Sequence, residues 1–185
     1  MSEMNRIAIL ASGSGTNAEQ IVKYLHGHAQ ISVELILSNN PSAYVLERAR
    51  QLRKPSRVFD RSQFRESEVL GWLREYQITH VVLAGFLWLI PESWLLEFPN
   101  RIINIHPALL PKFGGKGMYG EKVHQAVKDA GESETGITIH LVNAHYDEGH
   151  ILFQAKCKVQ PEDSPADIAT KVHQLEHQFY PPQIE

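Results

Sequence analysis

Five short apolar runs, separated by amphipathic stretches, constrain the fold of the first hundred residues. The runs occupy residues 6–11, 31–37, 56–59, 80–86 and 101–105, and apolar residues recur at helical spacing over 18–25, 43–52, 63–76 and 91–98. Short apolar runs are typical of strands buried on both faces, and strands that alternate with helices indicate βαβ units. The sequence therefore predicts an α/β fold with a Rossmann-like, mostly parallel twisted sheet flanked by helices.

The second half of the chain departs from this alternation. Four glycines in residues 112–120 predict a mobile loop, and residues 121–130 look helical. Apolar and polar residues alternate over 136–143 and again over 150–159, which is typical of strands with one face buried. We expect these two strands to form an antiparallel C-terminal extension of the sheet, joined by a turn at residues 146–149.

A capped helix is predicted near the C-terminus. Ser164 is a suitable N-cap residue, and Pro165 is suitable as the first helical residue for a helix over 166–179. No internal repeat or low-complexity linker divides the 185 residues, a length that supports one substantial core. We therefore expect a single domain over residues 1–185.

Composition and charge exclude several classes of function. The net charge of -3 supplies no basic field that would attract nucleic acid or an anionic membrane. Cys157 is the single cysteine, so neither an internal disulfide nor a four-thiolate metal site can form. Residues 1–6 show no signal-peptide pattern, and the apolar run at 81–91 is too short to span a bilayer. These features predict a soluble, cytoplasmic protein.

A glycine loop follows the first predicted strand. Gly13, Gly15 and Ala18 formally satisfy the dinucleotide-binding pattern, and a strand–loop–helix unit directs backbone N–H groups at an anion. A dinucleotide site also needs an acidic residue at the end of the second strand, but residues 37–40 read Leu-Ser-Asn-Asn. The loop therefore favours a simple phosphate ester over NAD. The alternative is that the glycines only allow close packing of the helix on the strand.

Asn104 and His106 lie two residues apart on a predicted strand, so their side chains share one face of the sheet. A lone histidine at a strand end is more often structural, but this one lies at a carboxyl end, where active groups of open α/β sheets gather. The Asn104 amide can donate to a carbonyl oxygen that becomes an oxyanion, and His106 can add a donor and move a proton.

Asp147 is the third candidate of this site. Acidic residues in turns are often only turn-formers. If Asp147 instead lies beside His106, its charge raises the pKa of the imidazole and it can order a water that relays protons.

The ten histidines raise the question of a metal site. His140, His145 and His150 recur every five residues, which matches neither a strand face nor a helix face. His173 and His177 are four residues apart on a predicted helix but lack a third ligand. We expect no metal.

Seven motifs carry a resemblance to a known family. They are Gly13-Ser-Gly-Thr-Asn17, Leu46-Glu-Arg-Ala-Arg50, Val81-Val-Leu-Ala-Gly-Phe86, Asn104-Ile-His-Pro-Ala-Leu-Leu-Pro111, Thr135-Gly136, Asp147-Glu-Gly149 and Glu176-His-x-x-Tyr-Pro181. In this order they resemble the phosphoribosylglycinamide formyltransferases over nearly the whole chain. The fourth motif is shared by enzymes that use 10-formyltetrahydrofolate, and the first and last narrow the resemblance to the glycinamide ribonucleotide enzymes.

The resemblance implies a transferase of one-carbon metabolism. The formyl group of 10-formyltetrahydrofolate, the cosubstrate, would pass to the amine of 5-phosphoribosylglycinamide in de novo purine biosynthesis, without a metal or a covalent enzyme intermediate. Asn104, His106 and Asp147 would form the catalytic trio, in which Asp147 keeps His106 charged. The other implied contacts are Gly15, Thr16, Asn17 and Glu176 for the ribonucleotide, and Arg65, Leu87, Trp88, Leu89, Ile90, Asn104 and Asn143 for the folate.

Within the single formyltransferase domain, the resemblance assigns phosphate and ribonucleotide binding to about residues 1–100 and catalysis and folate binding to about 101–185. Trp88 stands where many relatives carry arginine, so folate contacts there are expected to differ. Alternatives are a formyltetrahydrofolate hydrolase, a sugar or tRNA formyltransferase, or a non-catalytic nucleotide-sensing module. Both a monomer and a homodimer are compatible with the sequence.

Overall fold

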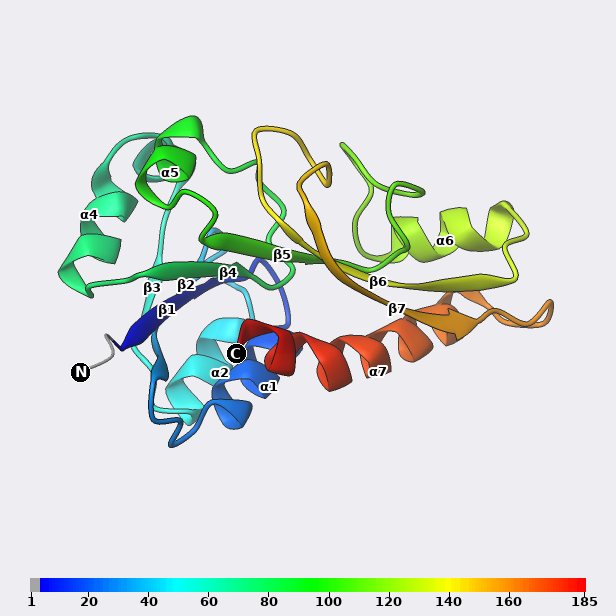
Figure 1. Cartoon of the computed structure of the whole chain (residues 1–185), viewed down its shortest axis with the longest axis horizontal. Helices are drawn as coiled ribbons and strands as arrows, with labels where there is room; N and C mark the ends of the chain where they lie inside the picture. Colours follow the sequence, from blue (N-terminus) through cyan, green and yellow to red (C-terminus); the bar gives the residue numbers. More distant parts are fainter. Residues whose placement is uncertain (1–3) are drawn as a thin grey trace.

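The structure, a computed structural model, describes residues 4–185 and is built on a seven-stranded twisted sheet (Figure 1). The strands are β1 (Asn5–Leu10), β2 (Ile31–Ser38), β3 (Ser56–Val58), β4 (His80–Leu83), β5 (Ile102–His106), β6 (Glu134–Leu141) and β7 (Ile151–Lys158). Their order in the sheet is β3-β2-β1-β4-β5-β6-β7. The first five strands are parallel, and β6 and β7 extend the sheet antiparallel, as the sequence predicted.

Helices cover both faces of the sheet (Figure 1). They are α1 (Thr16–Tyr24), α2 (Val45–Gln51), α3 (Arg61–Arg65), α4 (Glu68–Glu75), α5 (Glu92–Glu97), α6 (Glu121–Asp129) and α7 (Pro165–Ile184). Alternate residues of the buried strands point to opposite faces. Thus Ile7 and Ile9 pack in a core with α1, α2 and α7, whereas Leu10 packs with Phe64 and Trp94 in a second core. The two cores hold the helices against both faces of the sheet and so fix the positions of the strand ends.

The single helix predicted over residues 63–76 is instead two helices, α3 and α4. Asp60 and Gln63 form a capping box that starts α3, and the extended backbone of Glu66 ends it. A new helix follows Ser67. The prediction was wrong at this point because both helices bury apolar residues on the same core, so the apolar spacing continues across the break.

The C-terminal helix begins as predicted but is longer. Ser164 caps α7 in a capping box, and the helix continues past the predicted end at residue 179. Tyr180 is fully buried in this extra turn, and its hydroxyl donates to the carbonyl of Leu83 at 2.8 Å. This bond fixes α7 against the end of β4, and it places Glu176, one turn earlier, beside the carboxyl ends of the central strands.

The point where the strand order reverses lies between β1 and β4. The chain continues from β1 toward β2 on one side, whereas β4 and β5 lie on the other. Open α/β sheets leave a crevice at such a point, outside the carboxyl ends of the strands. Here the loops that follow the two strands touch, because the backbone N–H of Ser12 donates to the carbonyl of Gly85 at 3.0 Å.

Candidate active site

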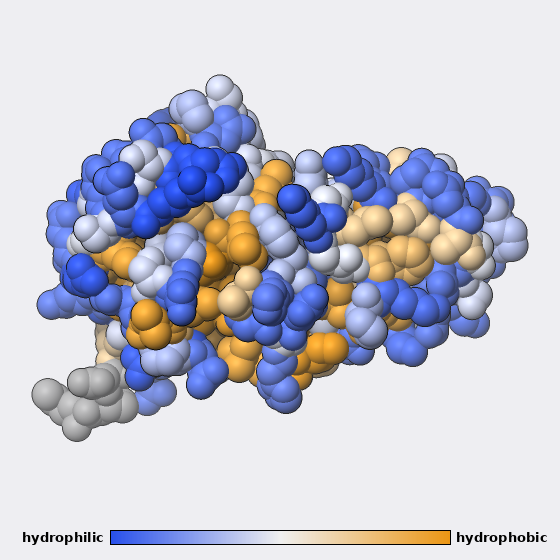
Figure 2. Space-filling model, turned by 90° about the horizontal axis from the view of Figure 1, so that it is seen from above, coloured by the Kyte–Doolittle hydropathy of each residue, from blue (hydrophilic) through white to orange (hydrophobic). Residues whose placement is uncertain are grey.

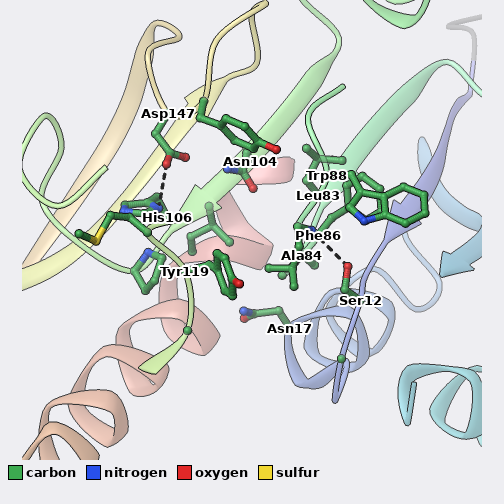
Figure 3. Close-up of a pocket in the computed structure, with 18 of the residues that line it drawn as sticks. Ser12, Asn17, Leu83, Ala84, Phe86, Trp88, Asn104, His106, Tyr119 and Asp147 are labelled. Carbon is green, nitrogen blue, oxygen red and sulfur yellow. Dashed lines mark hydrogen bonds and ion pairs between the residues drawn. The ribbon is translucent and has the colours of Figure 1, made fainter. Parts of the chain in front are cut away.

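A cavity of about 880 Å³ opens at this crevice. Its walls come from the loops after β1, β4 and β5, from the glycine-rich segment 115–120, from the turn before β7 and from α7 (Figure 3). The predicted site residues that line it are Gly15, Thr16, Asn17, Leu87, Trp88, Leu89, Ile90, Asn104, His106, Asp147 and Glu176. Arg65 and Asn143 are not among the lining residues. The structure thus gathers most of the candidates, from distant parts of the sequence, around one space.

The glycine loop forms one end of the cavity. Gly15 precedes α1 with a left-handed backbone (φ 75°), and no side chain caps this helix. A Cβ atom on Gly15 would lie 2.4–2.8 Å from atoms of Val45, so the position requires glycine. Arg48 holds the loop from α2 by donating from Nε to the Ser14 carbonyl at 2.7 Å. The free N–H groups of the first turn of α1 are therefore available to an anion.

Glu176 is a buried carboxylate, 7% exposed, rather than a surface residue. Asn17 donates from Nδ2 to its Oε2 at 3.0 Å, which joins α1 to α7. Burial raises the pKa of Glu176, although the bond from Asn17 and the nearby His173 act in the opposite direction. Asn17 Oδ1 is buried and has no protein partner. A ligand that carries an N–H or O–H donor would satisfy it.

Asn104, His106 and Asp147 meet at the other end of the cavity (Figure 3). His106 Nδ1 lies 3.5 Å from Asp147 Oδ2, and the same oxygen accepts a hydrogen bond from the backbone N–H of Gly115 at 3.0 Å. Asp147 has a left-handed backbone (φ 57°), a conformation in which aspartate is enriched and which occurs at functional sites. The Asn104 amide faces His140, with 3.2 Å between Nδ2 and Nε2.

Both ring nitrogens of His106 face acceptors. Nε2 lies 2.7 Å from the carbonyl of Phe113, and Nδ1 faces the Asp147 carboxylate. The Asp147 charge raises the pKa of His106, as the sequence predicted, but burial lowers it by more, so the net direction is downward. Desolvation of this 3% exposed side chain thus outweighs the Asp147 charge in the free protein. That Asp147 keeps the ring charged during the reaction stays a prediction. Asp147 itself has a lowered pKa despite burial, since His140, His106 and Gly115 favour its charged form.

An aromatic wall borders the cavity on the side of α3 and α5. Phe64 and Trp88 lie within 5.6 Å of each other, measured between ring centroids, and the Arg61 guanidinium lies 4.3 Å over the Trp88 ring. Arg61 therefore supplies the guanidinium that lines the cavity, in place of Arg65. Arg65 is one helical turn further along α3, at its end. In the view of Figure 2, apolar surface is exposed between hydrophilic rims on the face that carries the loops; Leu87 and Leu89 are each about 40% exposed.

Sequence reasoning missed several residues that line the cavity. They are Arg61, Tyr119, His124, His140 and His173. The sequence carries a signal for Arg61 alone, because the residue follows a helix cap directly after a strand and so lies at the carboxyl edge of the sheet. The three histidines carry no such signal, because their convergence depends on strand register and helix packing.

Within residues 4–185, no three or more His, Cys, Asp or Glu side chains are grouped so that they could hold a metal ion. Nor does any helix there have the length and apolar character needed to cross a membrane.

Comparisons with known proteins show the family of the chain. The family model for formyl transferases matches residues 5–184. The chain is 41% identical over 182 residues to the chloroplastic phosphoribosylglycinamide formyltransferase of Arabidopsis thaliana, covering 95% of this chain and 62% of that protein. It is 36% identical to phosphoribosylglycinamide formyltransferase of Haemophilus influenzae, covering 96% of this chain and 84% of that one.

Solved structures show the same fold. Glycinamide ribonucleotide transformylase 1 of Symbiobacterium toebii superposes with a TM-score of 0.90 at 34% identity, over 100% of this chain and 87% of that chain. The corresponding protein of Geobacillus kaustophilus gives 0.88 at 34% identity, over 98% and 97%. Since the family model covers nearly all of the sequence, the chain belongs to the formyl transferase family.

Proposed function

We propose that this chain transfers the formyl group of 10-formyltetrahydrofolate to the amine of 5-phosphoribosylglycinamide, a step of de novo purine biosynthesis. One observation carries the proposal. A single cavity joins an uncapped helix N-terminus, a buried carboxylate and the Asn104–His106–Asp147 group. These three features suit, in the same order, the phosphate and the amine of the ribonucleotide and the formyl carbonyl of the folate.

The ribonucleotide would lie along α1 and α7. Backbone N–H groups of Gly15, Thr16 and Asn17 suit a phosphate, because the helix dipole and free donors point the same way. Glu176, held by Asn17, would receive the amine end of the substrate. Binding of the phosphate thus falls to about residues 1–100, and catalysis to about 101–185.

The folate would occupy the apolar side of the cavity. Leu87, Trp88, Leu89 and Ile90 offer a wall for a flat ring. Arg61 suits the carboxylates that a folate carries, since it is exposed at the rim and already stacked on Trp88. Neither Arg65 nor Asn143 lines the cavity, so we assign the guanidinium contact to Arg61.

The reaction would proceed by direct attack of the amine. A C–N bond forms at the formyl carbon, and the carbonyl electron pair moves to oxygen, where Asn104 donates to the oxyanion. Burial lowers the pKa of His106 and so favours the neutral ring, which can accept a proton. Through a water held by Asp147, it takes the proton that the amine nitrogen loses.

The second half of the reaction uses the charged ring. The imidazolium beside Asp147 adds stabilisation of the oxyanion and then passes its proton to the N10 atom of the folate. The C–N10 bond breaks as the carbonyl re-forms. The products are the formylated ribonucleotide and tetrahydrofolate, so atoms and charge balance without a metal or a covalent enzyme adduct.

The test is formyl transfer from 10-formyl-5,8-dideazafolate to glycinamide ribonucleotide, followed by absorbance for the wild type and His106→Ala. We expect turnover that requires the ribonucleotide and that the substitution abolishes. Cofactor loss without the ribonucleotide would indicate a hydrolase instead. Ribonucleotide binding without any turnover would contradict the proposed activity and favour a sensing module.

A further inference from the structure

His140 lies directly opposite Asn104 in the sheet. The antiparallel register of β5 and β6 pairs these two residues, so their side chains are cross-strand neighbours. His140 is 2% exposed and lines the cavity. The pairing of β6 with β7 shifts register between Ile139 and His140. Such bulges redirect a side chain and are frequent beside active sites.

The backbone of β6 determines which ring nitrogen of His140 carries the proton. Nδ1 lies 2.9 Å from the Leu141 carbonyl, which can only accept, so Nδ1 must donate. Gly149 secures this arrangement, because a Cβ atom there would lie 1.5 Å from the Leu141 oxygen and 3.3 Å from His140 Nδ1. In the neutral ring the other nitrogen, Nε2, is therefore an acceptor, and only a ring protonated on both nitrogens would donate from Nε2 toward Asp147.

That acceptor fixes the amide of Asn104. Nδ2 of Asn104 lies 3.2 Å from His140 Nε2, within hydrogen-bonding distance, whereas Asp147 Oδ1 is 3.6 Å from the same nitrogen and outside it. A flipped amide would place Oδ1 against the Nε2 lone pair. One hydrogen of the Asn104 amide is thus directed at His140, and the second remains as a donor for a substrate oxygen.

We propose that His140 is a positioning residue: its backbone-anchored ring holds the Asn104 amide in the one orientation that presents an N–H to the formyl oxygen. This inference rests on the proposed function. Because the second donor of Asn104 acts on the oxyanion, loss of His140 should lower kcat and leave the binding of both substrates nearly unchanged.

The test is a double-mutant cycle of His140→Leu and Asn104→Ala, with His140→Gln as the conservative variant. Leucine removes the acceptor, whereas the glutamine amide oxygen can occupy the place of Nε2. We expect His140→Leu to lower kcat by roughly 10–100-fold, less than the roughly 10²–10³-fold cost of removing an oxyanion donor outright, with each KM within about threefold. Glutamine should restore most of kcat. In the Asn104→Ala background, His140→Leu should add less than about a twofold further loss, since its route of action is gone.

Additive losses in the cycle, or a rise in KM at unchanged kcat, would overturn the proposal. A readout that needs no turnover separates this result from failure of the proposed function. In the ¹⁵N spectrum of the wild type, His140 should carry its proton on Nδ1, and one Asn104 side-chain proton should move in His140→Gln and His140→Leu. If the wild type transfers no formyl group, these signals alone decide: a proton on Nε2, or an unmoved Asn104 amide, would contradict the positioning role.

Discussion

The two ends of the cavity offer different kinds of groups to a ligand. At the α1 end, the groups offered to a ligand are mainly backbone N–H groups, made available by the left-handed conformation of Gly15. At the β5 end they are side chains, brought together by strand register and by a turn that holds Asp147. Both ends lie at the carboxyl ends of the strands of one sheet. The α1 end depends on a residue without a side chain, Gly15, whereas the β5 end depends on the chemistry of its side chains.

This difference indicates which changes each end tolerates. A backbone site loses its function when a Cβ atom prevents the loop conformation, and it is insensitive to most neighbouring side chains. A side-chain site retains its fold after a conservative substitution but loses chemistry. The β5 end should therefore show losses in kcat without unfolding, and the α1 end should show losses in stability and ribonucleotide binding together.

The largest expected effect is at the β5 end. His106→Ala should lower kcat by about 10²–10⁴-fold, the range of a lost proton-transfer group, while the KM for the ribonucleotide stays similar. Steady-state kinetics checks this outcome. His26→Ala, an exposed histidine in the loop after α1, is the matched control. A loss of similar size in the control would show that the effect is not specific to the cavity.

Gly15→Ala tests the α1 end. The substitution forces a Cβ atom into Val45 at a left-handed position, so we expect a loss of about 1–3 kcal/mol in the free energy of unfolding, together with a raised KM for the ribonucleotide. Chemical denaturation measures the first quantity. Gly13→Ala is the comparison, since a Cβ there meets nothing within 4 Å. Equal destabilisation by both would refute the steric argument.

Glu176 is bonded to Asn17 at the α1 end, and its ionisation should carry a cost in stability. A carboxyl whose pKa is raised on folding gives stability that is present below its unfolded pKa of about 4.5 and is lost as pH rises through the folded value. Glu176→Gln removes this loss. The Tm of the variant should therefore exceed that of the wild type increasingly as pH rises from about 4.5 through the folded pKa, by roughly 2–4 °C per kcal/mol. A constant difference across this window would show that charge burial is not the cause.

The smallest effect is expected at the aromatic wall. Arg61→Ala should raise the KM for the folate about two- to fivefold, as expected for an exposed ion pair with a folate carboxylate worth about 0.5–1 kcal/mol, whereas Arg65→Ala should change it little. Kinetics at saturating ribonucleotide compares the two variants. A larger effect from Arg65→Ala would restore the original assignment.

Much of the fold could be predicted from the sequence because local patterns determine it. The buried strands read as apolar runs, and the antiparallel pair was visible in its alternation. The break between α3 and α4 escaped prediction, since two short helices on one core keep the spacing of a single long helix. Ser164 was found because a capping residue acts on its own neighbours.

Only those parts of the site that are formed by residues close together in the sequence could be predicted. Asn104 and His106 lie on one face of a strand because side chains alternate along a strand, so their convergence could be predicted. The contact of His140 with Asn104 depends on the β5–β6 register, and the place of His124 depends on how α6 packs. The pKa of His106 shows the same limit, because a neighbouring charge can be proposed from sequence but the extent of burial cannot.

Direct transfer of the formyl group from the folate to the ribonucleotide amine can be tested by an isotope experiment. The enzyme would be given 10-formyltetrahydrofolate labelled with ¹³C in the formyl group, together with glycinamide ribonucleotide, and the products would be followed by NMR. Direct transfer predicts one labelled formamide on the ribonucleotide for each tetrahydrofolate released, with no labelled formate. Labelled formate formed at the same rate with or without the ribonucleotide would contradict it.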